Sequence, residues 1–158
     1  MDISFMTEQG KFNFRICALI INDNKILAMK DDKSPYYFLP GGRVHMGEPA
    51  EEAIIREGHE ELGITVNIVR PLWINQGFFT EDLEQVKFHE ICIYFLVDIA
   101  NTALISLGQT FQSTEGSRTH TFEWLDFHPL KGLYFYPNFL KKDIFNLPEE
   151  LTLRTEIE

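Results

Sequence analysis

Alternating and continuous apolar runs predict most of the strands in this chain. Residues 12–21 alternate and then become wholly apolar, and residues 25–30 repeat the pattern after the turn-forming residues 22–24, so these segments predict a hairpin. The strongest and longest strand pattern covers residues 88–99. Shorter strands are expected over residues 36–39, 65–69, 72–78 and 122–125.

Two helices are expected. Pro49 opens a stretch of good helix formers that continues to Leu62, and Gly63 is typical of a helix C-terminus. A short helix is expected over residues 139–145, whereas residues 101–121 are predicted to be irregular apart from the apolar stretch 103–107. This order of elements predicts an α+β fold with a mixed or antiparallel sheet, in a single domain over residues 1–158.

The charge balance restricts the partners. The 158 residues include 14 Lys and Arg against 24 Asp and Glu, so the formal net charge is −10. This excess disfavours binding to duplex nucleic acid, and it would repel a phosphorylated small molecule unless bound cations reversed the local field.

The apolar segments and the N-terminus indicate no membrane partner. The longest apolar stretch, residues 91–99, is far shorter than the roughly 20 residues of a membrane helix, and residues 1–4 lack a secretory pattern, so we expect a cytoplasmic location. Cys17 and Cys92 lie in strand-like runs and are expected to be buried as small hydrophobic residues, with a zinc site or a disulfide as the alternative.

Three glutamates recur at helical spacing. Glu57, Glu60 and Glu61 stand at i, i+3 and i+4, which places their carboxylates on one face of the predicted helix, opposite apolar residues such as Ile54 and Leu62. Like charges at this spacing repel one another. The cluster is therefore either a solvated flank or a face that holds divalent cations, since Mg²⁺ takes carboxylate oxygens while substrate phosphates complete its shell.

Gly41 and Gly42 directly follow a predicted strand. Two glycines there allow a sharp turn, a close approach to a ligand, or a carbonyl presented to a metal. The sequence after them lacks the Gly-Lys-Ser/Thr of a phosphate-binding P-loop, and neither a dinucleotide fingerprint nor a zinc-protease helix is present.

These residues together resemble the Nudix box. That pattern reads glycine, five residues, glutamate, seven residues, then Arg-Glu-aliphatic-x-Glu-Glu-x-Gly-aliphatic. The fixed positions match in identity and spacing, and Gly58 stands at one position that is normally aliphatic. The matching residues are Gly42, Glu48, Arg56, Glu57, Glu60, Glu61, Gly63 and Ile64.

The resemblance implies a fold, a reaction and a set of roles. The fold would be an α/β/α sandwich around a mixed sheet, and the reaction would be hydrolysis of a nucleoside diphosphate linked to another moiety, with Mg²⁺ or Mn²⁺. Glu57, Glu60 and Glu61 would bind the metal, with the Gly41 carbonyl as a further ligand. Arg56 would orient a box glutamate by a charge-assisted hydrogen bond. Glu48, with Gly42, would brace the loop against the helix.

Further candidates lie outside the box. Water would attack phosphorus in line and a carboxylate would accept its proton. Family members often take this base, or another metal ligand, from a separate loop, and Glu115 is the candidate, with Glu123 and Glu90 as alternatives. Arg43 and Lys30 are candidates for phosphate contact. The candidates for stacking on a base are Tyr36, Tyr37, Phe38, Phe78 and Phe79.

Alternative functions remain open from the sequence. The partner would be a small-molecule nucleoside diphosphate derivative, and a homodimer is a further expectation from the resemblance. A non-catalytic nucleotide sensor, an isomerase acting on a diphosphate ester, and an acidic interaction domain are the alternatives. Gly58 would cost about 1 kcal/mol relative to Ala in a helix interior, so either a bulky neighbour fills the space or the helix packs closer to the sheet.

Overall fold

The computed structural model describes residues 1–158 and shows an α+β sandwich built on one mixed sheet. Its strands are β1 (Ser4–Thr7), β2 (Gly10–Asn22), β3 (Lys25–Asp31), β4 (Gly41–Arg43), β5 (Asn67–Thr80), β6 (Lys87–Asp98), β7 (Thr110–Glu115), β8 (Arg118–Asp126) and β9 (Thr152–Ile157). Its helical segments are α1 (Ala50–Glu57), the π-helical turn η1 (Gly58–Leu62), the 3₁₀ turns η2 (Leu104–Leu107) and η3 (His128–Gly132), and α2 (Leu140–Asp143).

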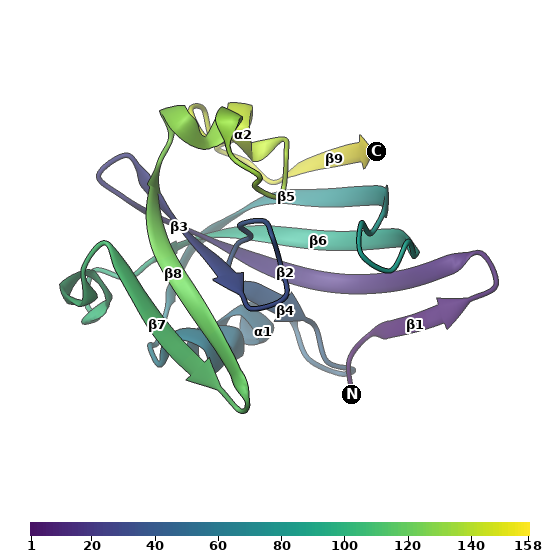
Figure 1. Cartoon of the computed structure of the whole chain (residues 1–158), viewed down its shortest axis with the longest axis horizontal. Coiled ribbons are helices and arrows are strands. Elements are labelled where there is room, and N and C mark those ends of the chain that lie inside the picture. The colour runs from purple at the N-terminus through teal and green to yellow at the C-terminus, as the bar shows by residue number, and fades with distance from the viewer.

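The long strand β2 organises the sheet. The strand order is β7-β8-β3-β2-β6-β5-β9, and β1 and β4 also pair with β2 (Figure 1). The pairs β2–β6 and β5–β9 are parallel and all the others are antiparallel. One edge of β2 therefore pairs with β6, while the other edge pairs in turn with β1, β4 and β3.

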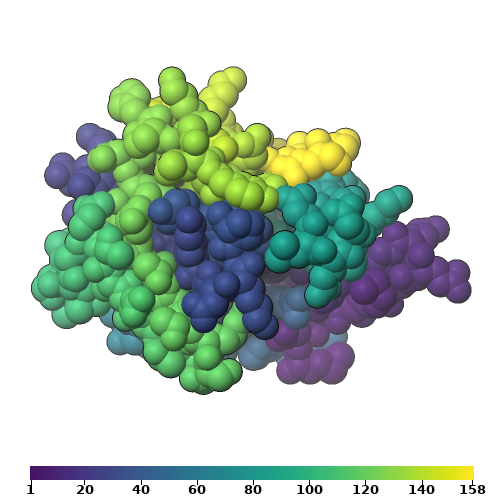
Figure 2. Space-filling model, viewed as in Figure 1, coloured from purple at the N-terminus to yellow at the C-terminus, as the bar shows by residue number.

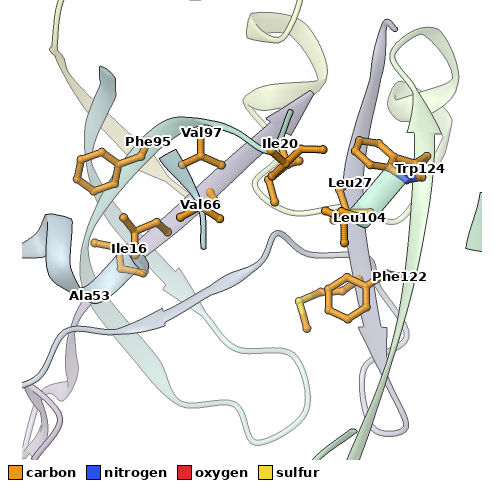
Figure 3. Packing of buried hydrophobic residues seen from close by; sticks show 14 of the residues in the cluster. Ile16, Ile20, Leu27, Ala53, Val66, Phe95, Val97, Leu104, Phe122 and Trp124 are labelled. Carbon is orange, nitrogen blue, oxygen red and sulfur yellow. The ribbon is translucent and has the colours of Figure 1, made fainter. Parts of the chain in front are cut away.

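Alternate residues of β2 enter two cores on opposite faces of the sheet, as the period of two in a strand requires. Ile16 and Ile20 belong to a buried cluster that includes Ala53 of α1, and Leu19 belongs to a second cluster that includes Leu140 of α2. Figure 3 shows Ala53 beside Ile16 at one end of the first cluster, with Leu27, Leu104, Phe122 and Trp124 at the other. The two helices thus cover opposite faces, which confirms the predicted sandwich.

The predicted box helix forms, but its last turn is a π-helix. Residues 50–57 are α-helical and residues 58–62 make the wider turn. Gly63 then ends the helix in the left-handed region, with φ of 65°, as predicted. Gly58 is buried at the junction, where an added Cβ would lie 3.1 Å from Cγ1 of Val66. The absent side chain therefore lets the helix pack closely on the segment that follows it.

We expect Gly58→Leu to destabilise the fold by about 3 kcal/mol, because a side chain forced into this packed junction must displace Val66. Urea unfolding would measure the free energy. Gly132→Leu is the matched control, since a Cβ there meets no atom within 4 Å. Equal stability of the two variants would contradict the close-packing explanation.

Several elements differ from the prediction. Residues 36–39 form only isolated bridges, through Tyr37 and Phe38, and it is residues 41–43 that form the short strand β4. Residues 65–69 and 72–78 were predicted as two strands, but one strand, β5, runs over residues 67–80 with register shifts near Arg70 and Pro71. The predicted helix over residues 139–145 is confirmed only in its central part, as α2.

The prediction of an irregular segment over residues 101–121 is wrong. This segment contains η2, β7 and the beginning of β8, and the last two strands form a hairpin that turns at Gly116, with φ of 61°. The outward positions of β7 are polar, so the apolar signal of a strand is weak there. The terminal strands β1 and β9 were also missed, and both are largely exposed at sheet edges.

Cys17 and Cys92 are buried free thiols, as expected, with their Sγ atoms 3.6 Å apart on adjacent strands. No helix in the structure combines the length and the apolar character that crossing a membrane requires.

Candidate active site

Arg56 connects the box glutamates to one another. Its Nε and Nη2 donate to the two carboxylate oxygens of Glu48 at 2.8 and 3.0 Å, in a bidentate arrangement. Its Nη1 donates to Glu57 at 2.9 Å and to Glu60 at 3.1 Å, and Nη2 also donates to the Arg43 carbonyl at 3.0 Å. All five donors of the guanidinium are therefore used, which fixes α1 and η1 against the loop that precedes them.

The two glycines bring the backbone against the glutamates. The Gly41 amide donates to Glu61 Oε1 at 2.8 Å, so the contact made by Gly41 is through its N–H rather than the carbonyl singled out from the sequence. A Cβ on Gly42 would overlap the Glu57 carboxylate. Glu48 accepts from the His45 amide at 3.0 Å and holds the loop to the helix.

The β7–β8 hairpin brings two more groups to Glu61. Glu115 lies at the end of β7, and His120 lies on β8 with its Nε2 3.7 Å from Glu115 Oε2. Ligand atoms of Glu61, Glu115 and His120 all lie within 4.8 Å of one another. Sequence reasoning missed His120, although it shares the inward face of β8 with Phe122 and Trp124, and that alternation is the signal that could have found it.

The glutamates differ in exposure and in pKa. Burial raises the pKa of Glu57 to about 7, the Arg56 hydrogen bond and charge lower it, and the charges of Glu60 and Glu115 raise it. Burial and the charge of Glu57 raise the pKa of Glu61 well above its usual range. By contrast, the Arg56 hydrogen bonds lower the pKa of Glu48 to about 2. A bound cation would offset the burial and mutual repulsion of Glu57 and Glu61.

The raised pKa of Glu57 predicts a pH-dependent response to Mg²⁺. Between the usual pKa of 4.5 and about 7, the folded protein keeps a proton that the unfolded chain has lost, so the free energy of unfolding falls as pH rises through this window. Mg²⁺ takes the deprotonated carboxylate. The rise in melting temperature on adding Mg²⁺ should therefore be larger at pH 8 than at pH 5.5.

Thermal unfolding with and without Mg²⁺ at the two pH values measures this difference, and Glu57→Gln should reduce it. An equal shift in melting temperature at both pH values would contradict the assignment.

A cavity of about 670 Å³ extends from the glutamates along one face of the sheet. Its lining includes Glu57, Glu60, Glu61 and Glu115. It also includes residues of the β3–β4 and β5–β6 connections and of the strands of the β7–β8 hairpin. Figure 2 shows the β3–β4 connection, in dark blue, between the green β7–β8 segment and the teal β5–β6 turn. The four carboxylates thus border one space.

The remaining sequence candidates divide between the cavity and the exterior. Glu90 and Arg43 line the cavity, as do Tyr36, Phe38 and Phe79. Lys30, Tyr37, Phe78 and Glu123 do not. Lys30 lies over the Tyr37 ring, 4.2 Å from its centroid, and Glu123 accepts from the Tyr37 hydroxyl at 3.1 Å. These two side chains are therefore engaged outside the cavity, and the structure does not bring them to the glutamates.

The fold and the cavity define a class of α+β sandwich protein in which a glutamate-rich helix borders a cavity on a mixed sheet. A family model described as the NUDIX domain matches residues 11–142. The chain therefore belongs to the Nudix hydrolase family, which confirms the resemblance seen in the sequence.

Curated relatives carry several pyrophosphatase names. An ADP-ribose pyrophosphatase of Methanocaldococcus jannaschii is 36% identical over 85 residues, covering 52% of this chain and 48% of the relative. A putative 8-oxo-dGTP diphosphatase of Bacillus subtilis is 34% identical, covering 54% and 55%. The chain thus spans about half the length of these two relatives. An RNA pyrophosphohydrolase of Nitratiruptor is 24% identical, covering 87% and 91%.

Solved structures share the fold at low identity. A MutT protein from Bacillus halodurans superposes with a TM-score of 0.60 at 19% identity, covering 90% of this chain and 89% of that one. A Nudix hydrolase from Nitrosomonas europaea gives a TM-score of 0.60 at 13% identity, covering 99% and 93%. These likenesses support the mixed-sheet sandwich.

Proposed function

We propose that this protein hydrolyses the diphosphate linkage of a nucleoside diphosphate derivative, in a reaction that depends on Mg²⁺ or Mn²⁺. One observation carries the proposal: three glutamates of one helix and a fourth from the β7–β8 hairpin border the same cavity. Carboxylate oxygens are the ligands that Mg²⁺ takes, and Mg²⁺ sites commonly leave positions for substrate phosphates. The donor set therefore fits a divalent cation.

The chain's own groups would divide the work. Glu57, Glu60 and Glu61 would hold the cation, with the Gly41 carbonyl as a further ligand, since carboxylate and carbonyl oxygens suit Mg²⁺ and Mn²⁺. Glu115 and His120 lie beside Glu61 at the same place. Bound divalent cations neutralise phosphate oxygens and lower the pKa of water.

Arg56 would position the glutamates, and Glu115 would act as the general base. Arg56 holds the carboxylates of Glu57 and Glu60 by its hydrogen bonds. Glu115 would accept the proton of the attacking water, since its carboxylate is partly exposed at the cavity beside Glu61. The water oxygen would form a bond to one phosphorus while the bond from that phosphorus to the bridging oxygen breaks, and the bridging oxygen leaves with the other phosphorus, so that two phosphorylated products result.

The names of the relatives support cleavage of a diphosphate bond, and they do not identify the group attached to the diphosphate. ADP-ribose pyrophosphatase, 8-oxo-dGTP diphosphatase and RNA pyrophosphohydrolase all name the cleavage of a phosphate anhydride, on substrates that differ beyond it. The proposed substrate class, a small-molecule nucleoside diphosphate derivative, is the one that the resemblance in the sequence implies.

A panel of such substrates tests the proposal. It would include ADP-ribose, nucleoside triphosphates, dinucleoside polyphosphates and nucleotide sugars, each incubated with Mg²⁺ or Mn²⁺ and scored for phosphorylated products. We expect turnover of at least one substrate that stops when EDTA removes the metal. Binding of these nucleotides without turnover would instead support a sensor, and neither binding nor turnover would support the acidic interaction domain.

A further inference from the structure

The arginines that line the cavity differ in whether they have an acidic partner. Three of the four are paired. Arg56 is held by Glu48, Glu57 and Glu60, as described above. The other paired residues are Arg43, whose Nη1 lies 3.5 Å from Asp2 Oδ2, and Arg118, whose Nη2 lies 3.1 Å from Asp31 Oδ2. The fourth, Arg15, forms no side-chain hydrogen bond or ion pair within the chain, and its Nε is buried without a partner.

Arg15 lies on the wall of the cavity that the sheet forms. It lies on β2, and it shares a face of that strand with Asn13 and Cys17, which also line the cavity. Glu90 on the adjacent strand β6 accepts a hydrogen bond from Asn13 at 3.4 Å rather than from Arg15. Burying a guanidinium without a hydrogen-bond acceptor costs free energy. In the protein without ligand, the N–H donors of Arg15 are therefore available to a ligand.

The register of the sheet places Arg15 near the glutamates. Cys17 is opposite Gly41 across the β2–β4 pair, and the amide of Gly41 donates to Glu61. Arg15 is two residues from Cys17 along β2, a distance of about 7 Å along a strand. A diphosphate bound to the glutamates through a cation would therefore lie within reach of the Arg15 side chain.

We propose that Arg15 binds a phosphate oxygen of the diphosphate substrate, an inference that rests on the proposed function. Its planar fork matches a phosphate bidentately, and the other cavity arginines already have carboxylate partners. Arg15 therefore takes the role for which Arg43 and Lys30 were candidates from the sequence, of which Arg43 pairs with Asp2 and Lys30 lies outside the cavity.

Calorimetric titration with methylenediphosphonate in the presence of Mg²⁺ tests this role, because the P–C–P bridge of this probe is not hydrolysed. We expect at least about tenfold weaker binding in Arg15→Met and in Arg15→Gln, equivalent to the loss of one or more charge-assisted hydrogen bonds. Arg118→Gln is the matched control on the same cavity, with a side chain 61% exposed, and should bind within about twofold of the wild type.

Thermal unfolding without ligand separates binding from a structural role. Arg15→Met removes a cation that forms no hydrogen bond or ion pair within the chain, but whose charge acts on Glu90 and Glu61, so its melting temperature should stay close to that of the wild type. A lower melting temperature together with unchanged diphosphonate affinity would overturn the proposal, as would unchanged affinity in both variants. If the wild type bound the probe through Arg15 yet hydrolysed no substrate of the panel, the proposed function would fail and the assignment of Arg15 would stand.

Discussion

Glu57→Gln is expected to lower kcat for diphosphate hydrolysis at least about 10²-fold at saturating Mg²⁺. Glutamine keeps the shape of the side chain and an oxygen for the Arg56 hydrogen bond, but it removes the charge that would hold the cation. The fold should persist, because the carboxylate is largely buried and its pKa is raised to about 7 by that burial. Near pH 8 the metal-free variant should be as stable as the wild type or more stable.

Steady-state kinetics and urea unfolding measured on the same preparation check both halves of this expectation. Glu51→Gln is the matched control, since Glu51 is exposed in the first turn of the same helix and does not line the cavity. A kcat within about threefold of the wild-type value in Glu57→Gln would remove this residue from the reaction.

Gly42→Ala is expected to reduce activity at least about tenfold with little loss of stability. The added methyl group would overlap the carboxylate of Glu57, and that carboxylate is the end of a flexible side chain that can move away. Its displacement would disturb the cation site, since small errors in the placement of reacting groups lower rates strongly. Stability and activity should therefore separate in this variant.

The comparison variant for this prediction is Gly132→Ala, where a new Cβ meets no neighbour within 4 Å. Metal-dependent turnover and the urea midpoint would be measured for both variants. Full activity in Gly42→Ala would show that the position of Glu57 against the β4 backbone has no part in the reaction.

Local spacing in the sequence predicted the helix and its loop correctly. Arg56 and Glu60 stand at i and i+4, so helix geometry alone brings these two side chains into reach of one another. The hydrogen bond of Arg56 to Glu60 follows from that spacing, whereas its bonds to Glu48 depend on how the loop before α1 folds against the helix. The spacing does not predict the π-helical turn, which begins at Gly58, where a Cβ would lie 3.1 Å from Cγ1 of Val66.

Contacts between segments distant in the sequence were harder to predict. Glu115 was chosen from a segment expected to be irregular, and it reaches Glu61 only because that segment folds into a polar edge hairpin. His120 joins them from the second strand of the same hairpin. Arg15 gave no signal as a single basic residue in a strand, because its lack of a partner is visible only when the whole cavity is assembled.

Calorimetric titration of Mn²⁺ into the wild type and into Glu61→Gln at pH 8 tests the central claim most directly. Glu61 is buried, accepts from the Gly41 amide, and lies beside Glu115 and His120, so it joins the helix, the β4 strand and the hairpin in one proposed cation site. The account predicts saturable Mn²⁺ binding to the wild type and at least about tenfold weaker binding to the variant. Absence of Mn²⁺ binding to the wild type, or equal binding to both proteins, would contradict it.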